Sequence, residues 1–383
     1  MTSSIYPPGL GQPAVPQPPA HSQRAWLEVD LGAIRRNAER LQRAARVPIV
    51  AMIKADAYGL GALAVARALQ HMGSALWGFG VSTLAEADEL RTAGFDARIL
   101  CCTPLLAREL SYANRLGVIP ALHRIDDINE WATLGGGAWH LSIDTGMSRA
   151  GIRWDDVSTL VSGLRRHAPE GVFTHFHSAE ISSDSRVGQE QRLRDALTVL
   201  RDSLPANVLV HSDNSAGIAA RTCADSASPG ALARPGIGLY GAFVAETLAL
   251  EQVVHLRARV VDVRDVHAGE TVGYGAGFTA AATCRIATVS AGHGDGYRRA
   301  LSNRGEALLH ARRVAVAGVV SMDMTMLDVT GVRCDVGDIV TLIGRDGSEC
   351  LTTDAVALAG ALSPYELLVG LRLRLPRVYS GEV

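Results

Sequence analysis

Hydrophobic and polar positions alternate in a repeating rhythm over the first two thirds of the chain. Short apolar runs are followed by longer stretches in which apolar residues recur roughly every three or four positions. The short runs predict strands and the longer stretches predict amphipathic helices, in the order typical of a parallel sheet. The predicted strands are Ile49–Ile53, Leu76–Val81, Ala97–Cys102, Gly117–Ala121, His140–Ile143, Val172–His175, Val208–His211 and Gly236–Tyr240.

Predicted helices separate these strands and complete an α/β pattern. Eight strands alternating with helices predict a (β/α)8 TIM barrel over residues 25–243. An open, doubly wound sheet is the alternative, because a sequence does not show whether a sheet closes. A further strand, Trp26–Val29, comes first and belongs either to the barrel or to the domain that follows it. The predicted helices are Leu31–Ala45, capped by Asp30, and Leu60–Met72, Leu84–Ala93, Pro104–Leu116, Ile125–Leu134, Trp154–His167, Gly188–Ser203 and Ser215–Cys223.

The rhythm changes in the last third of the chain, where helical periods fade and β-branched runs with Gly-Asp turns take over. This pattern predicts a mainly β C-terminal domain over residues 244–383. At the other end, residues 1–24 are rich in proline and predict a disordered tail. The C-terminal elements that we expect are strands Val253–Val266, Cys284–Val289, Ala315–Val320 and Asp338–Ile343, a helix Thr353–Ala361 and an extended segment Leu373–Tyr379.

Composition narrows the class of protein. The 383 residues carry a net charge of −2 without a basic block, which argues against a nucleic-acid or anionic-membrane partner. No apolar stretch is long enough to cross a membrane. The six cysteines form no CxxC pair and have no metal-ligand spacing, so we expect free thiols, no metal site and a reducing cytoplasm.

One residue type is unusually rare. Lys54 is the only lysine among 37 lysine and arginine residues, and it ends the first predicted barrel strand. Surface charge can be supplied by either base, but a guanidinium stays protonated and cannot form a Schiff base. The single lysine therefore indicates a position where an amine is needed.

Other polar residues occur at the ends of the predicted strands, where the chemistry of a (β/α)8 barrel gathers. Tyr58 follows Lys54, the loop Asp144–Arg149 follows the fifth strand, and His175, Ser215 and Arg234–Tyr240 occupy the ends of the last three. Each residue alone has an ordinary structural explanation, such as a helix cap or a surface ion pair. Together, an amine, a glycine-rich turn and an arginine are what a pyridoxal phosphate site requires.

The chain from about Trp26 to Tyr379 resembles the alanine racemases, which are fold-type III pyridoxal phosphate enzymes. The resemblance implies a homodimer that shares its active sites between subunits and interconverts L- and D-alanine, supplying D-alanine for peptidoglycan. The matching motifs are Lys54-Ala-Asp-Ala-Tyr58-Gly-Leu-Gly61, Ile143-Asp-Thr-Gly-Met-Ser-Arg149-Ala-Gly151, Thr174-His175-Phe176, Asn214-Ser215-Ala216, Arg234-Pro-Gly-Ile-Gly-Leu-Tyr-Gly241, Val272-Gly-Tyr274-Gly275, Asp295-Gly-Tyr297, Met322-Asp323 and Pro376-Arg-Val-Tyr379.

The resemblance also implies roles for individual residues. Lys54 would carry the cofactor and act as one base, and Tyr274 of the partner subunit would be the opposing base. His175 would lie between Tyr274 and Arg234. The phosphate would be bound by Tyr58, Ser215, Gly236, Ile237 and Tyr379, and the substrate carboxylate by Arg149, Met322 and Asp323.

Arg234 has a physical role that can be argued from its chemistry. A guanidinium is always protonated and only donates hydrogen bonds, so a pyridine nitrogen beside it stays unprotonated. The ring then withdraws electrons less strongly than it would beside a carboxylate, which favours racemisation over transamination.

Three positions depart from the family pattern. Ser142 stands where the family often has a carbamylated lysine, His293 stands where it has a tyrosine near the active-site entrance, and Met324 stands where a glutamine is usual. These departures leave open a racemase of another or broader range of amino acids, for example serine.

Two alternatives belong to other functional classes. A fold-type III amino-acid decarboxylase would have a glutamate at the ring nitrogen, and Arg234 argues against it. A non-catalytic pyridoxal phosphate carrier would be a barrel alone, which leaves the β domain unexplained.

Overall fold

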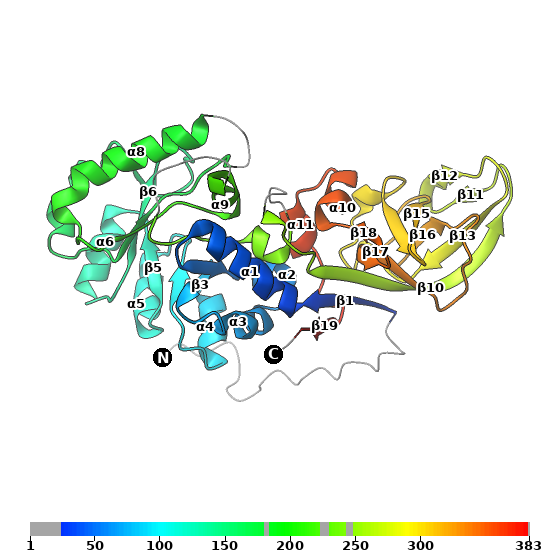
Figure 1. The fold of residues 1–383 in the computed structure, drawn as a ribbon, viewed down its shortest axis with the longest axis horizontal. Coiled ribbons are helices and arrows are strands. Elements are labelled where there is room, and N and C mark those ends of the chain that lie inside the picture. The colour runs from blue at the N-terminus through cyan, green and yellow to red at the C-terminus, as the bar shows by residue number, and fades with distance from the viewer. Residues whose placement is uncertain (1–23, 180–183, 223–229, 243–247, 382–383) are drawn as a thin grey trace.

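The computed structural model describes residues 24–179, 184–222, 230–242 and 248–381. The tail predicted to be disordered lies outside this part of the chain except for its last residue. Figure 1 shows an elongated molecule, with a lobe of helices around strands at one end and a lobe of strands at the other. The long strand β10 (Val254–Val266) runs from the middle of the molecule into the second lobe.

The first lobe is built on a ring of parallel strands. Their order around the sheet is β2 (Ile49–Met52), β3 (Leu76–Val81), β4 (Ile99–Cys101), β5 (Ile119–Leu122), β6 (His140–Asp144), β8 (Gly171–Phe173) and β9 (Leu209–His211), with the short β7 (Ile152–Arg153) beside β6. Residues 230–235 close the ring by bonding to both ends of this row. On one side the Ala231 N–H donates to Val210 O (2.6 Å), and on the other the Val50 N–H donates to Ala233 O (2.8 Å). The predicted barrel is confirmed, and the open sheet is excluded.

The eighth predicted strand is wrong in position. Residues Ile237–Tyr240 form a 3-10 helix, η5, and the segment that closes the barrel lies just before it. Pro235 has no N–H for a ladder, and the backbone of Gly236 leaves the extended region with ψ −93°. The chain therefore turns at the point where the sequence pattern suggested a strand.

Helices cover the outside of the ring, and most follow the predicted pattern. One prediction was wrong: the helix Trp154–His167 is replaced by η3 (Val157–Leu160) and the short α7 (Val161–Leu164), because β7 uses the residues just before it to pair with β6. Asp30 caps the first helix as expected, accepting from the Ala33 N–H at 2.8 Å. The other helices are α1 (Leu31–Ala45), α3 (Ala62–Gln70), α4 (Leu84–Thr92), α5 (Ala107–Arg115), α6 (Ile125–Thr133), α8 (Ser185–Leu200) and α9 (Ser215–Thr222).

The second lobe is a closed antiparallel barrel. Its six strands follow the order β10, β13 (Cys284–Val289), β16 (Thr325–Asp328), β15 (Arg312–Val316), β14 (Glu306–Leu309) and β17 (Ile339–Asp346), and β17 pairs back with β10. The predicted strand Ala315–Val320 is displaced, since β15 ends before Gly318, which has a φ of +85°. The remaining elements include β11 (Thr271–Val272), β12 (Phe278–Thr279), β18 (Glu349–Leu351), α10 (Thr353–Ala359) and α11 (Pro364–Val369).

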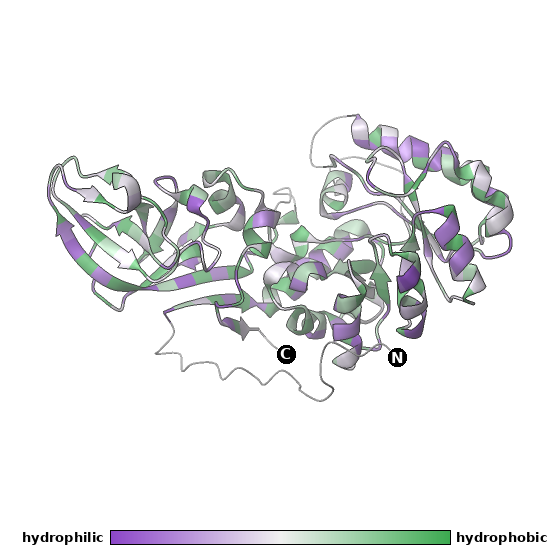
Figure 2. Cartoon of the chain, turned by 180° about the vertical axis from the view of Figure 1, so that it is seen from behind, coloured by the Kyte–Doolittle hydropathy of each residue, from purple (hydrophilic) through white to green (hydrophobic). Residues whose placement is uncertain are grey.

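The two ends of the described chain meet in the second sheet. The strand β1 (Ala25–Asp30) pairs antiparallel with β10 and parallel with β19 (Arg377–Ser380). The predicted extended segment Leu373–Tyr379 begins instead as a turn and becomes a strand only at Arg377. Buried and half-buried residues alternate over the first half of β10, and Figure 2 shows the matching alternation of hydrophobic and hydrophilic residues.

Neither disulfide bonds nor a metal site stabilises the part of the fold that the structure describes. Five cysteines lie within the described residues, and all five are free thiols, as expected; Cys223 lies outside. In the same part of the chain no group of three or more His, Cys, Asp or Glu side chains could hold a metal ion. None of the described helices is long and apolar enough to span a membrane.

Candidate active site

The loop that carries Lys54 has an unusual backbone. Directly after β2, the turn α2 (Lys54–Gly59) has four consecutive residues in the left-handed region, from Ala55 to Tyr58, with φ between 51° and 59°. Left-handed backbone costs roughly 1–2 kcal/mol for each non-glycine residue, so neighbouring contacts must hold it. Glu86 accepts from the Ala55 N–H at 2.8 Å, and the side chain of Asp56 accepts from the N–H of Ala62 at 2.7 Å.

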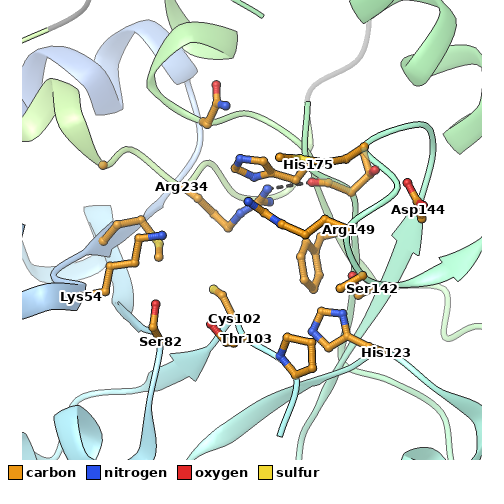
Figure 3. Close-up of a pocket in the computed structure, with 18 of the residues that line it drawn as sticks. Lys54, Ser82, Cys102, Thr103, His123, Ser142, Asp144, Arg149, His175 and Arg234 are labelled. Atoms are coloured by element: carbon orange, nitrogen blue, oxygen red, sulfur yellow. Dashed lines mark hydrogen bonds between the residues drawn. The ribbon is translucent and has the colours of Figure 1, made fainter. Parts of the chain in front are cut away.

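This turn directs Lys54 and Tyr58 into one cavity at the ends of the barrel strands. The cavity has a volume of about 400 Å³, a size suited to a small cofactor with substrate. Figure 3 shows that Lys54 enters it from one wall, with Arg234, Arg149 and His175 gathered across from it. The predicted site residues that line it are Lys54, Tyr58, Arg149, His175, Ser215, Arg234, Gly236 and Ile237.

One wall of the cavity is a cradle of hydrogen-bonding groups. The buried hydroxyl of Ser215, at the start of α9, accepts from the N–H groups of Gly236 (2.9 Å) and Gly238 (3.1 Å). Gly236 is required here, because a β-carbon at this position would lie 2.4 Å from the hydroxyl oxygen of Tyr58. Burial raises the pKa of Tyr58, so its phenol stays a donor at neutral pH. The hydroxyl groups of Ser215 and Tyr58 can each donate to a phosphate.

Arg234 lies at the base of the cavity and is held by the protein on one side. Its NH1 contacts His211 Nδ1 (2.6 Å) and His211 O (3.0 Å), and its NH2 donates to Thr174 O (2.7 Å) and Ser212 O (3.4 Å). A guanidinium has five N–H donors. Within the described residues only the Nε–H lacks an acceptor, and Arg234 itself lines the cavity. One donor is therefore left for a ligand.

Two histidines in the cavity wall are kept neutral. Burial lowers the pKa of His175 to about 3, and the positive charge of Arg234 contributes to the shift. Burial likewise lowers the pKa of His123 to about 4, and neither of its ring nitrogens has a hydrogen-bond partner in the described residues. The two histidines therefore add no positive charge to the cavity at neutral pH.

Arg149 extends over the cavity from the loop after β6. The side chain of Asp144 shapes this loop by accepting from the N–H groups of Gly146 (2.9 Å) and Ser148 (3.1 Å). No carboxylate in the described chain forms an ion pair with Arg149, and Ser142 lies beside it in the cavity wall (Figure 3). The guanidinium is available for a carboxylate ligand.

Three predicted residues come from the second lobe and do not line this cavity. Tyr274 lies in η7 (Tyr274–Ala276), between β11 and β12, and is 72% exposed. Met322 is 59% exposed, and Asp323 pairs with Arg374 at 2.9 Å. Within one subunit the structure therefore brings together only the barrel residues of the predicted site.

Tyr379 also lies outside the cavity, which corrects the prediction that it contacts the phosphate. It sits on β19 beside β1, and its hydroxyl donates to Leu60 O at 3.1 Å. Tyr365, on α11, lines the cavity instead, with its ring centre 6.0 Å from that of Tyr58. No sequence signal pointed to Tyr365, because the approach of α11 to α2 is a tertiary contact.

Cys102 and His123 were missed as well, although a signal existed. Both residues directly follow barrel strands, β4 and β5, and both line the cavity. The rule that placed Lys54 at a strand end applies to them equally.

The first domain is an α/β barrel whose mouth holds one amine, an anion cradle and an arginine that can only donate, and the second is a closed β barrel. This combination defines a two-domain class of Schiff-base enzyme. The family model described as "Alanine racemase, N-terminal domain" matches residues 29–243, and the model described as "Alanine racemase, C-terminal domain" matches residues 253–379. The chain belongs to the alanine racemase family.

Individual relatives agree over nearly the whole chain. The alanine racemase of Syntrophobacter fumaroxidans is 36% identical over 387 residues, which cover 94% of this chain and 98% of the relative. The biosynthetic alanine racemase of Pseudomonas aeruginosa superposes with a TM-score of 0.83 at 33% identity, covering 94% of this chain and 99% of its own. The alanine racemase of Bartonella henselae, solved with covalently bound pyridoxal phosphate, gives 0.84 at 28% identity and covers 94% and 100%.

Proposed function

We propose that this protein is a pyridoxal phosphate-dependent racemase that interconverts L- and D-alanine. Lys54 and Tyr274 of the partner subunit act as two opposed bases. The observation that carries the proposal is the cavity in which Lys54, the only lysine of the chain, faces an anion cradle and Arg234. Family membership supports it over the full length of both lobes.

The residues present fit pyridoxal phosphate. The phosphate would be held by Ser215, Tyr58 and the backbone of Gly236 and Ile237. Two observations support this: Gly236 has no β-carbon to block a close approach to its backbone, and the hydroxyl of Ser215 is buried beside it. The Nε–H of Arg234 would donate to the ring nitrogen. Tyr365 would add a phenol hydroxyl in place of Tyr379.

The chemistry divides between the cofactor and the protein. Pyridoxal phosphate, when bound, withdraws electrons from Cα of an amino acid and so makes the Cα proton removable. The amine of Lys54 removes or returns that proton on one face, and the phenol of Tyr274 serves the opposite face. Arg149 holds the substrate carboxylate and so fixes the orientation of Cα. His175 stays neutral because its pKa is lowered, and so it places no second positive charge beside Arg234.

The second base requires a second subunit. Tyr274 does not line the cavity of its own chain, and its side chain is 72% exposed on a tight turn of the β domain. We propose a homodimer in which this turn, with Met322 and Asp323, enters the cavity of the partner. The exposed apolar side chains of Met322 and Met324 beside it would be covered in such a dimer.

The wider assignments follow from this activity. We propose that residues 25–243 form the cofactor-binding domain and residues 244–383 the domain that serves the partner, in line with the two matched ranges. D-Alanine made in the cytoplasm would supply cell-wall peptidoglycan. Ser142 of one subunit, together with His293 and Met324 brought by its partner, would set the substrate range, with alanine as the main substrate.

The test is the variant Lys54→Arg, which keeps the charge and removes the amine. Loss of both the visible absorbance of the bound cofactor and the interconversion of L- and D-alanine is expected, whereas retained racemisation would refute the proposal. A matched control is Arg67→Lys on the exposed face of α3, which should leave both signals unchanged.

A further inference from the structure

A line of polar side chains leaves the active-site cavity at Arg234 and runs through the inside of the barrel. His211 Nδ1 lies 2.6 Å from Arg234 NH1, and His211 Nε2 lies 2.8 Å from His140 Nδ1. The remaining nitrogen, His140 Nε2, is 3.7 Å from Glu170 Oε2. Both imidazoles are fully buried.

The line crosses the whole barrel. His211 ends β9, whereas His140 begins β6 and Glu170 directly precedes β8. Strands in a parallel barrel begin at one mouth and end at the other. Glu170 therefore lies at the mouth opposite the cavity, where it is 29% exposed and lines a surface hollow.

The two ends of this line favour the same arrangement of protons. Arg234 can only donate, so the arrangement that suits this end has His211 Nδ1 as the acceptor and the His211 proton on Nε2. Nε2–H then donates to His140 Nδ1, which places the His140 proton on Nε2, facing the carboxylate of Glu170. Burial lowers the pKa of His211 well below its ordinary value, and Arg234 lowers it further, so this imidazole is neutral. Burial also lowers the pKa of His140.

The line does not conduct protons to the active site. A guanidinium does not give up its proton, so no proton can pass Arg234 in either direction. What the line can transmit is orientation, because a cation at one end and an anion at the other align all the intervening dipoles.

The outer end is held firmly enough to act as a reference. Glu170 forms an ion pair with Arg98, whose guanidinium stacks over the ring of Trp77 at 4.4 Å. Trp77 also contacts the ring of His140, with 5.4 Å between ring centres. The arginine that holds the carboxylate and the imidazole that faces the carboxylate are thus packed against the same indole.

We propose that Glu170 is a positioning residue for Arg234. His140 Nε2 has no hydrogen-bond partner in the described residues, and the negative charge of Glu170, 3.7 Å away, favours a proton on this nitrogen. Glu170 thereby favours the Nε2–H form of His140 and His211, and this keeps an acceptor pointed at Arg234 NH1. The guanidinium is then held with its Nε–H toward the cavity. This role rests on the proposed function, in which that Nε–H meets the ring nitrogen of the cofactor.

The test replaces Glu170 with groups that differ only in what they can accept. Glu170→Gln retains an oxygen acceptor, whereas Glu170→Lys offers only donors to His140. A matched charge reversal, Glu306→Lys, removes a carboxylate that also pairs with an arginine, Arg313, but in the β domain. Ring-nitrogen signals of histidine are recorded by ¹⁵N NMR on the full-length protein with cofactor bound, and are assigned by replacing one histidine at a time.

We expect the native protein, Glu170→Gln and Glu306→Lys to show His140 and His211 protonated on Nε2 alone. In Glu170→Lys both rings should change their protonated nitrogen together, with kcat lowered about tenfold and KM changed much less. A native His211 protonated on Nδ1, or rings unchanged in Glu170→Lys, would overturn the proposal. A protein without racemase activity but with the expected ring signals would refute the proposed function and leave this arrangement of protons standing.

Discussion

Removing the hydroxyl of Ser215 is the most quantitative test of the anion cradle. In Ser215→Ala the N–H groups of Gly236 and Gly238 lose their shared acceptor. A buried N–H without a partner costs roughly 1–3 kcal/mol, so with two such groups the cofactor-free protein should lose about 2–6 kcal/mol of unfolding free energy. With the cofactor present the loss should be larger, because weaker binding of the cofactor also removes part of its stabilisation of the folded protein.

The same change weakens cofactor binding, because the hydroxyl can no longer donate to the phosphate. A hydrogen bond to a charged group contributes about 1.5–3 kcal/mol, which corresponds to a dissociation constant raised roughly 10- to 100-fold. Equilibrium dialysis measures this constant, and chemical denaturation measures the stability with and without cofactor. Ser203→Ala, a buried serine that does not line the cavity, is the control and should change neither quantity. An unchanged dissociation constant in Ser215→Ala would refute the assignment of this wall to the phosphate.

Three further predictions concern other parts of the structure. Ala55→Gly should raise the unfolding free energy by about 1 kcal/mol, because Ala55 is exposed and has a φ of 52°, which glycine adopts without strain. Ala64→Gly, in the right-handed helix α3, should lower it by about 1 kcal/mol. Denaturant titrations in which both variants change the unfolding free energy in the same direction would contradict the left-handed turn. The pKa of His123 is about 4 only in the folded protein, so between pH 6.5 and 4 the unfolded chain binds up to one more proton than the folded chain. The free energy of unfolding therefore decreases as the pH is lowered through this range. His123→Asn should make that fall shallower by up to about 1.4 kcal/mol per pH unit, and an unchanged slope would show that this imidazole is not buried neutral. Chiral chromatography over alanine, serine, bulkier and basic amino acids should give the highest kcat/KM for alanine; a higher value for any other substrate would contradict the assignment.

Local patterns in the sequence were sufficient for most of the fold. The helix Leu31–Ala45 and the strand Cys284–Val289 occur with the predicted bounds, because each has a clear period and clear end signals. The helix predicted at Trp154–His167 failed because pairing of β7 with β6 competes for the same residues. Propensity gives way to tertiary contacts in such segments.

The candidate site was predictable to the extent that its residues follow barrel strands. Lys54, His175, Ser215 and Arg234 were found in this way, and they do meet in one cavity. Tyr365 could not be found, because it reaches the cavity through packing of a helix from the other lobe. The left-handed turn after Lys54 was equally hidden, since alanine and aspartate residues give no sign that they adopt positive φ.

Mixing two inactive variants tests most directly whether the active site is shared between two subunits. Lys54→Arg lacks one base and Tyr274→Phe lacks the other, so a mixed dimer has one site with both bases intact and one site with neither. If subunits exchange at random, half of the dimers are mixed and half of their sites are native, which predicts about one quarter of the native racemase activity. If both bases came from the same chain, every site in the mixture would lack one of them. Activity no higher than that of either variant alone, with subunit exchange verified, would contradict the account.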